Sequence, residues 1–188
     1  MRAPEIVLAR HGETEWSRTL RHTGRTDVPL TQAGRAEARS LAARLADRDF
    51  ARVLVSPLSR AVETCELAGL GNSAEGRDEL LELNYGEYEG LTTAEIRESV
   101  PDWTVWTHGS PGGETVEDAA ARLDGLVGEL AAAEGDIAVF AHGHILRILA
   151  ARWLQQPAAF GARLALATGT LSVLGWEREA RCVRQWNS

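Results

Sequence analysis

Three short apolar runs, each followed by a helical pattern, constrain most strongly what this chain can fold into. The apolar runs are residues 5–9, 52–56 and 136–141. Each has the length of a β-strand, and the third is apolar nearly throughout, which indicates a strand covered on both faces. Segments with helical spacing follow at residues 30–45, 57–68 and 145–154. Strands that alternate with helices predict an α/β fold in three layers (α/β/α), with a mainly parallel central sheet.

Local signals place the ends of several elements. Thr31, Thr92 and Thr115 each precede a helical pattern and are predicted N-caps, the last of a helix that reaches about residue 134. Pro57 is expected in the first turn of its helix, where proline is well tolerated. Further strands are predicted near residues 163–167, 171–177 and 181–186. The sheet then has about six strands, one of them antiparallel, and no linker or repeat interrupts a single domain over residues 1–188.

Length and charge narrow the class of protein. The chain has 188 residues and a formal net charge of −7, which argues against nucleic acid or an anionic membrane as the main partner. No run approaches the roughly 18 apolar residues of a membrane span, and the first residues do not resemble a secretory leader, so a cytoplasmic protein is expected. Cys65 and Cys182 lack metal-ligand spacing and are interpreted as small buried residues rather than a disulfide.

All 20 basic residues of the chain are arginine. The absence of lysine excludes Schiff-base chemistry, anchoring of pyridoxal phosphate and the phosphate-binding lysine of a P-loop. Any phosphate bound by this chain must therefore be held by arginine, histidine and backbone amides.

Cationic side chains follow all three strands. Arg10 and His11 come directly after the first apolar run, Arg60 follows the second, and His142 follows the third. In an open α/β sheet, ligands bind beyond the carboxyl ends of the strands, where helix N-termini also point. Because a buried arginine beside a histidine is costly unless an anion lies against them, these positions predict an anion site.

The segment LARHGETEW, residues 8–16, is the first of five motifs that follow one another in a recognisable order. The others are residues 22–27, residues 56–61, Glu82 with Tyr85-Gly86, and residues 141–143. Together they resemble the histidine phosphatase superfamily, also called the phosphoglycerate mutase-like superfamily, over residues 5–153. The resemblance implies a phosphoglycerate mutase-like fold and an enzyme that transfers phosphoryl groups.

The resemblance also implies a role for each matching residue. His11 would attack phosphorus and become a phosphohistidine, while Arg10, Arg60 and His142 would bind the charged phosphoryl oxygens. Glu82 would protonate the departing alcohol and later activate water. That role requires a protonated Glu82 in the first step. Its apolar neighbours favour the neutral acid and nearby arginines favour the carboxylate, and the residues alone leave the outcome open.

Other positions are expected to contact substrate. Ser17, Thr23 and Gly24 lie where related proteins hold the phosphate or the substrate, and Gly143 follows the second histidine motif. His144 is interpreted as a wall of the site, a partner behind it, or a metal ligand. No carboxylate or third histidine follows at ligand spacing, so neither a metal nor another cofactor is expected.

A tryptophan- and glycine-rich segment, residues 103–114, is predicted to cover the pocket. Trp106 and His108 would then contact substrate, and Trp103 and Trp106 would either stack on a sugar or aryl ester or pack in the core. This segment and residues 140–147 resemble the broad-specificity and sugar-bisphosphatase branches of the family.

Three functions fit these residues. The preferred one is a metal-independent phosphatase of a small phosphoester, acting as a monomer or homodimer. The alternatives are a cofactor-dependent phosphoglycerate mutase and a non-catalytic phosphate-binding module. Mutases typically carry lysine and paired arginines as a second anion clamp, whereas only Arg97 and Arg122 are basic between residues 90 and 142. The presence of His11, Glu82 and His142 together favours an enzyme over a binding module.

Overall fold

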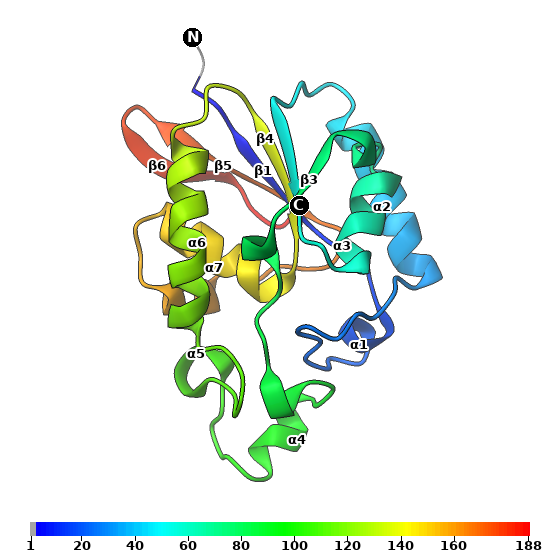
Figure 1. Cartoon of the computed structure of the whole chain (residues 1–188), viewed down its shortest axis with the longest axis vertical. Coiled ribbons are helices and arrows are strands. Elements are labelled where there is room, and N and C mark those ends of the chain that lie inside the picture. The colour runs from blue at the N-terminus through cyan, green and yellow to red at the C-terminus, as the bar shows by residue number, and fades with distance from the viewer. Residues whose placement is uncertain (1–2) are drawn as a thin grey trace.

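A six-stranded sheet forms the centre of the protein in a computed structural model that describes residues 3–188 (Figure 1). The strands are β1 (Ile6–Arg10), β2 (Arg52–Val55), β3 (Ala74–Gly76), β4 (Ile137–Ala141), β5 (Leu171–Glu177) and β6 (Ala180–Gln185), in the order β3-β2-β4-β1-β5-β6. Neighbours from β3 to β1 pair in parallel, whereas β5 pairs antiparallel with both β1 and β6. β5 therefore runs opposite to the other strands, and the predicted mainly parallel sheet with one antiparallel strand is confirmed.

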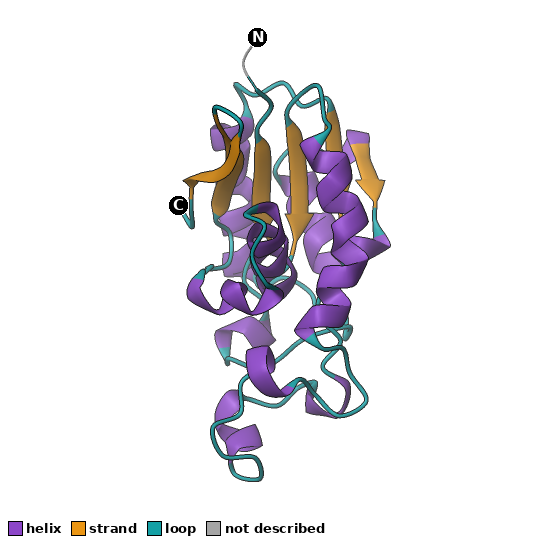
Figure 2. Cartoon of the chain, turned by 90° about the vertical axis from the view of Figure 1, so that its left-hand side faces the viewer, coloured by secondary structure: helices purple, strands orange, loops and turns teal. Residues whose placement is uncertain are grey.

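Helices cover both faces of the sheet (Figures 1 and 2). The α-helices are α1 (Glu15–Arg18), α2 (Gln32–Leu45), α3 (Ser59–Leu67), α4 (Thr93–Arg97), α5 (Val105–His108), α6 (Val116–Ala131) and α7 (Gly143–Trp153). Short 3₁₀ helices occupy Gly71–Ser73, Asp78–Leu80, Gly86–Tyr88 and Ala158–Arg163. Because successive strand residues point to opposite faces, Ile6 and Leu8 pack in one core cluster with α6 and α7, while Val7 and Ala9 pack in another with α2 and α3. The predicted three-layer α/β/α architecture is confirmed.

The predicted helix caps are observed. The Thr31 hydroxyl accepts a hydrogen bond from the backbone N–H of Gly34, and Thr92 and Thr115 each form a capping box with an acidic residue three positions later. The prediction for Pro57 is wrong. α3 begins at Ser59, whose backbone N–H and hydroxyl both donate to Asp27. An acid distant in sequence therefore binds the first turn of this helix, and Pro57 lies before it.

Two strand predictions differ from the structure. Residues 163–167 alternate like a strand, but they follow the 3₁₀ helix Ala158–Arg163 and form no ladder. The carbonyl of Leu166 instead accepts from the Arg10 side chain, and the backbone N–H of Ala167 donates to Asn187. β3 was not predicted, because its three residues include an exposed Glu75 and Gly76 and pair only along one edge of β2.

The short helices α1, α4 and α5 lie beyond the carboxyl ends of β1 and β4 (Figures 1 and 2). Parallel strands bring His11, at the end of β1, and His142, at the end of β4, to this same end. None of the helices within residues 3–188 is long and apolar enough to cross a membrane.

A close contact between glycines joins the loop after β1 to the start of α2. A Cβ atom on Gly12 would lie 2.2 Å from the backbone oxygen of Gly34, and a Cβ atom on Gly34 would lie 2.1 Å from the backbone oxygen of Glu13. Any side chain at either position would push this loop away from α2. The contact therefore holds the residues after His11 in place.

We expect Gly34→Ala to destabilise the protein by roughly 1–3 kcal/mol or more, because the new methyl group would overlap backbone atoms. Gly128→Ala is a matched control in the last turn of α6, where a Cβ atom would meet nothing within 4 Å. The control should leave stability unchanged or raise it by about 0.5–1 kcal/mol, since alanine favours helix over glycine. Urea unfolding of both variants checks this, and equal effects would contradict it.

Candidate functional site

A cavity of about 730 Å³ opens at the carboxyl end of the sheet. Among the described residues its lining includes one carboxylate, Glu82, and eight basic or imidazole side chains: Arg10, Arg21, Arg60, Arg97, Arg147, His11, His22 and His144. Such an excess of cationic groups in a concave site attracts anions. The structure thus brings together most of the residues that the sequence singled out.

His11 is held as a neutral imidazole with one defined free nitrogen. The residue is only 5% exposed, and Nδ1 lies 2.7 Å from the carbonyl oxygen of Gly12. Burial, and then the charges of Arg10 and Arg60, hold the His11 pKa well below its ordinary value. Because a carbonyl only accepts hydrogen bonds, Nδ1 carries the proton and Nε2 keeps its lone pair. An imidazole nitrogen in this state is able to act as a nucleophile.

Arg10 contributes a partly unpaired guanidinium to the cavity. It donates to the backbone carbonyl of Leu166, but its Nε is buried and has no hydrogen-bond partner within residues 3–188. Burial lowers the Arg10 pKa, which Glu82 partly opposes. A Cβ atom on Gly143 would lie 3.2 Å from Cζ of Arg10, so the glycine leaves room for this side chain. Because Arg10 lines the cavity, its guanidinium favours an anion there.

Arg60, which lines the cavity, forms a buried pair with His142. Both are fully buried, and Nε of Arg60 donates to Nδ1 of His142 over 3.1 Å. His142 consequently carries its proton on Nε2, which lies 2.7 Å from the hydroxyl of Ser56. The terminal nitrogens of Arg60 donate to the carbonyl oxygens of Gly24 and Thr26. These contacts fix the guanidinium that lines the cavity.

His142 does not line the cavity itself. Its ring centroid lies 5.1 Å from that of His11, and burial followed by the charge of Arg60 holds its pKa well below the ordinary value. The described contacts of His142 thus orient Arg60 and pack against His11. Gly24 likewise contributes its carbonyl to Arg60, whereas Ser17, Thr23 and Gly143 line the cavity directly.

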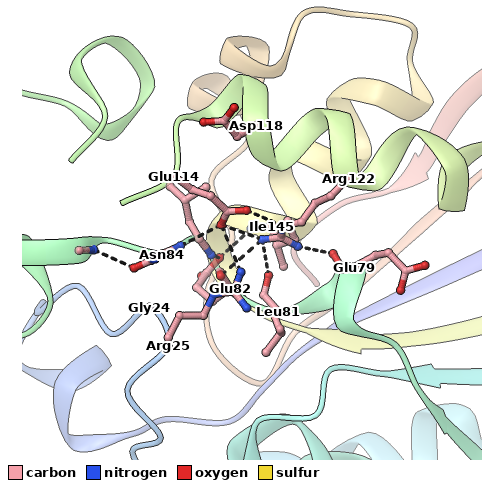
Figure 3. A network of polar contacts seen from close by, with 12 residues as sticks. Gly24, Arg25, Glu79, Leu81, Glu82, Asn84, Glu114, Asp118, Arg122 and Ile145 are labelled. Atoms are coloured by element: carbon pink, nitrogen blue, oxygen red, sulfur yellow. Dashed lines mark hydrogen bonds and ion pairs between the residues drawn. The ribbon is translucent and has the colours of Figure 1, made fainter. Parts of the chain in front are cut away.

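Glu82 is held at the N-terminus of α7 by three backbone amides. Oε1 accepts from the N–H groups of Leu83 and Ile145, both at 2.9 Å, and Oε2 accepts from that of His144 at 3.0 Å. Figure 3 labels Glu82 and Ile145. A carboxylate has about four acceptor positions, so the remaining one lies on Oε2. Glu82 is thereby fixed in the cavity with one oxygen available for a proton.

An ion pair outside the cavity supports the segment that carries Glu82 (Figure 3). Arg122 on α6 pairs with Glu114 at 2.7 Å and donates to the backbone carbonyls of Glu79 and Leu81. Glu114 also accepts from the backbone N–H of Asn84. Arg122 therefore braces the residues on both sides of Glu82 and does not line the cavity.

The predicted cover over the pocket is not seen among the residues that line it. No residue of the segment 103–114 is among those that line the cavity. Trp103 is 2% exposed and donates its indole N–H to the carbonyl of Gly109, so it packs in the core. Trp106 packs on Gly161, and the guanidinium of Arg147 stacks on its indole. His108 is exposed, and its Nδ1 is hydrogen-bonded to the hydroxyl of Thr107. Trp106 and His108 are therefore not retained as substrate contacts.

The cavity wall on that side comes instead from α4 and from residues that the sequence analysis did not assign. Thr92, Thr93, Ala94 and Arg97 line it, together with His22, Tyr85 and Arg147. The sequence could have assigned Arg147 to the site, because it lies four residues after Gly143 and thus on the same face of α7. No sequence pattern placed α4 at the cavity, because this helix reaches the cavity only through the tertiary fold.

Within residues 3–188, no group of three or more His, Cys, Asp or Glu side chains is placed to hold a metal ion. Cys65 is buried, Cys182 is half-buried, and neither forms a disulfide.

Comparison with known proteins identifies the family. The family model described as "Histidine phosphatase superfamily (branch 1)" matches residues 6–188. The chain belongs to this superfamily. It is a phosphatase of the histidine phosphatase type, as the motif pattern predicts.

Named relatives of this histidine phosphatase include phosphatases of different substrates. It is 43% identical over 187 residues to an acid phosphatase of Mycobacterium tuberculosis, covering 96% of this chain and 91% of that protein. It is 34% identical over 182 residues to a sedoheptulose 1,7-bisphosphatase of Saccharomyces cerevisiae, covering 80% and 67%. The solved structure of an open reading frame product of M. tuberculosis superposes with a TM-score of 0.89, at 41% identity, covering 99% of this chain and 98% of that one. The phosphoglycerate mutase-like fold is confirmed.

We expect His22 to make the protein less stable as the pH is lowered. Burial lowers its pKa from 6.5 to about 4. Between these values the unfolded chain binds a proton that the folded chain does not, so the free energy of unfolding drops as pH falls, by about 1.4 kcal/mol per pH unit.

His22→Gln removes this group and places an amide where Nε2 contacts Thr93. Between pH 7 and pH 5 the wild type should lose about 2 kcal/mol more than the variant in urea unfolding. Parallel losses would contradict the assignment.

Proposed function

We propose that this phosphatase hydrolyses a small phosphomonoester in two steps, through a phosphohistidine on His11 and without a metal ion. The observation that carries the proposal is the state of His11. Its Nδ1–H is bound to the Gly12 carbonyl, and its Nε2 lone pair is free in a cavity that also contains Arg10, Arg60 and Glu82. Nucleophile, charge-stabilising groups and acid therefore meet in one place.

In the first step the Nε2 lone pair of His11 attacks phosphorus, and the bond between phosphorus and the ester oxygen breaks. Arg10 and Arg60 bind the charged oxygens of the transferring group. Glu82 gives the proton on Oε2 to the departing alkoxide, so that a neutral alcohol leaves. Ser17 and Thr23 contact the phosphate or the substrate. The carbonyl of Gly24 holds Arg60, and Gly143 leaves room for Arg10.

In the second step Glu82 takes a proton from water while the water oxygen attacks phosphorus. The bond between phosphorus and Nε2 breaks, its electron pair returns to His11, and inorganic phosphate forms. His142 acts from behind, by orienting Arg60. The enzyme is then back in its starting state, with the proton on Glu82 and the lone pair on Nε2.

Water rather than a second phosphoester is the proposed acceptor. Mutases typically use lysine and paired arginines as a second cationic clamp, whereas this chain has no lysine, and of Arg97 and Arg122 only Arg97 lines the cavity, because Arg122 is bound to Glu114 outside it. The cavity is of a size that suits a small organic molecule. The acid phosphatase and sugar-bisphosphatase relatives support a small phosphorylated metabolite as the substrate.

We expect His11→Ala to lower the turnover of phenyl phosphate about a thousandfold or more, since no other group replaces the nucleophile. Radiolabelled substrate should leave an acid-labile, base-stable label on the wild type and none on the variant. Glu82→Gln should retain more label than wild type, because phenol leaves with little help from an acid whereas the variant cannot activate water for the second step.

His108→Ala is the matched control, because this histidine is exposed and outside the cavity. It should keep wild-type labelling and turnover. Full labelling of the His11 variant would overturn the proposed intermediate.

We also expect hydrolysis to dominate over transfer. The wild type, assayed with 3-phosphoglycerate primed by 2,3-bisphosphoglycerate, should release inorganic phosphate with negligible formation of 2-phosphoglycerate. Excess chelator should leave the hydrolysis rate unchanged. Dominant 2-phosphoglycerate formation would favour the mutase, and loss of activity in chelator would contradict metal independence.

A further inference from the structure

His144 lines the cavity but has no part in the steps proposed above. Its backbone N–H donates to Oε2 of Glu82, and its ring Nδ1 lies 2.6 Å from the hydroxyl of Tyr85. Nδ1 is 4.0 Å from Oε2 of Glu82, which is the oxygen proposed to hold the proton. The imidazole therefore lies beside the group that would protonate the ester oxygen.

The bond to Tyr85 defines which ring nitrogen of His144 carries the proton. Tyr85 is 1% exposed, and within residues 3–188 its hydroxyl has Nδ1 of His144 as its hydrogen-bond partner. A buried O–H that donates to nothing is costly, so the hydroxyl donates to Nδ1. Burial also raises the Tyr85 pKa and lowers the His144 pKa, which keeps both groups neutral. The proton of the imidazole is consequently on Nε2.

The Nε2–H of His144 faces the cavity. Nε2 has no hydrogen-bond partner in the described chain, yet it is not among the buried unpaired atoms, so it is accessible. The side chain is 21% exposed, and the residue lines the cavity. Trp106 packs on the imidazole with ring centroids 5.2 Å apart, and Arg147 stacks on the same indole at 4.6 Å. The stacked Trp106 and Arg147 thus hold the imidazole of His144 in place.

We propose that the Nε2–H of His144 donates a hydrogen bond to an oxygen in the organic part of the substrate, next to the ester oxygen, and so selects phosphoesters with a hydroxyl group near the ester carbon. The inference rests on the proposed function, because Glu82 as the acid is what places the ester oxygen beside His144. A neutral donor suits a neutral hydroxyl, whereas the arginines of the cavity suit charged groups. His144 is then a specificity-determining residue.

Two substitutions separate the donor from the rest of the ring. His144→Asn places an amide oxygen near the Nδ1 position, where it accepts from Tyr85, but it cannot reach the Nε2 position. His144→Gln carries an amide N–H to the Nε2 position and lacks the acceptor for Tyr85. Glycerol phosphate and propyl phosphate serve as matched substrates, because they share a carbon skeleton and differ in hydroxyl groups.

In the wild type kcat/KM should be higher for glycerol phosphate than for propyl phosphate. His144→Asn should lower this ratio roughly tenfold, as expected for the loss of one hydrogen bond, with little effect on propyl phosphate. His144→Gln should retain most of the ratio. Tyr85→Phe keeps the ring but removes the hydroxyl that fixes the proton of His144 on Nε2. It should lower the ratio by an intermediate amount. This variant tests the proposal even where His144→Asn fails to fold.

An unchanged ratio in His144→Asn, or a wild type without preference, would overturn the role of His144. That failure differs from failure of the proposed function, in which the wild type hydrolyses neither ester or forms no phosphohistidine from phenyl phosphate. Equal loss on both substrates in both His144 variants would also overturn the proposal, because it indicates a structural role.

Discussion

Burial of cationic and imidazole side chains at one end of the sheet is the constraint on which the rest of the structure depends. Arg60 and His142 are fully buried and His11 nearly so, and burying such groups is costly unless they are hydrogen-bonded. The chain meets this cost mainly with backbone carbonyls, from Gly12 for His11 and from Gly24 and Thr26 for Arg60. Each such hydrogen bond also orients a side chain. The carbonyls that offset the cost of burial therefore also fix the geometry of the site.

The same principle arranges the acid. Glu82 accepts three backbone N–H groups, two of them at the start of α7, while its own segment is braced by Arg122 and Glu114 (Figure 3). The cations at the end of β1 and the start of α3, and the carboxylate bound to the start of α7, thus face one cavity from different elements. Strands β1, β2 and β4 are neighbours in the sheet, which explains why residues distant in sequence meet there.

Errors in the sequence-based expectations have a common origin. Residues 163–167 have the alternation of a strand, but Arg10 and Asn187 take backbone groups that a ladder would need. Residues 103–114 have the composition of a mobile cover, yet Trp103 and Gly113 pack closely, with Gly113 against the backbone of Asn84. In each case a partner far away in sequence overrides a local preference.

The sequence by itself determined the alternation of strands and helices, the N-caps at Thr31, Thr92 and Thr115, and the identity of His11, Arg10, Arg60 and Glu82 as a set. The elements and caps are local properties, the positions of Arg10, His11 and Arg60 follow from the rule that parallel strands end together, and Glu82 came from the resemblance to the family. Only the tertiary structure decided that His142 stands behind Arg60, that α4 and not residues 103–114 forms the outer wall, and that Tyr85 orients His144. Those outcomes depend on which buried donor meets which acceptor across the fold, and one-dimensional spacing contains no record of that pairing.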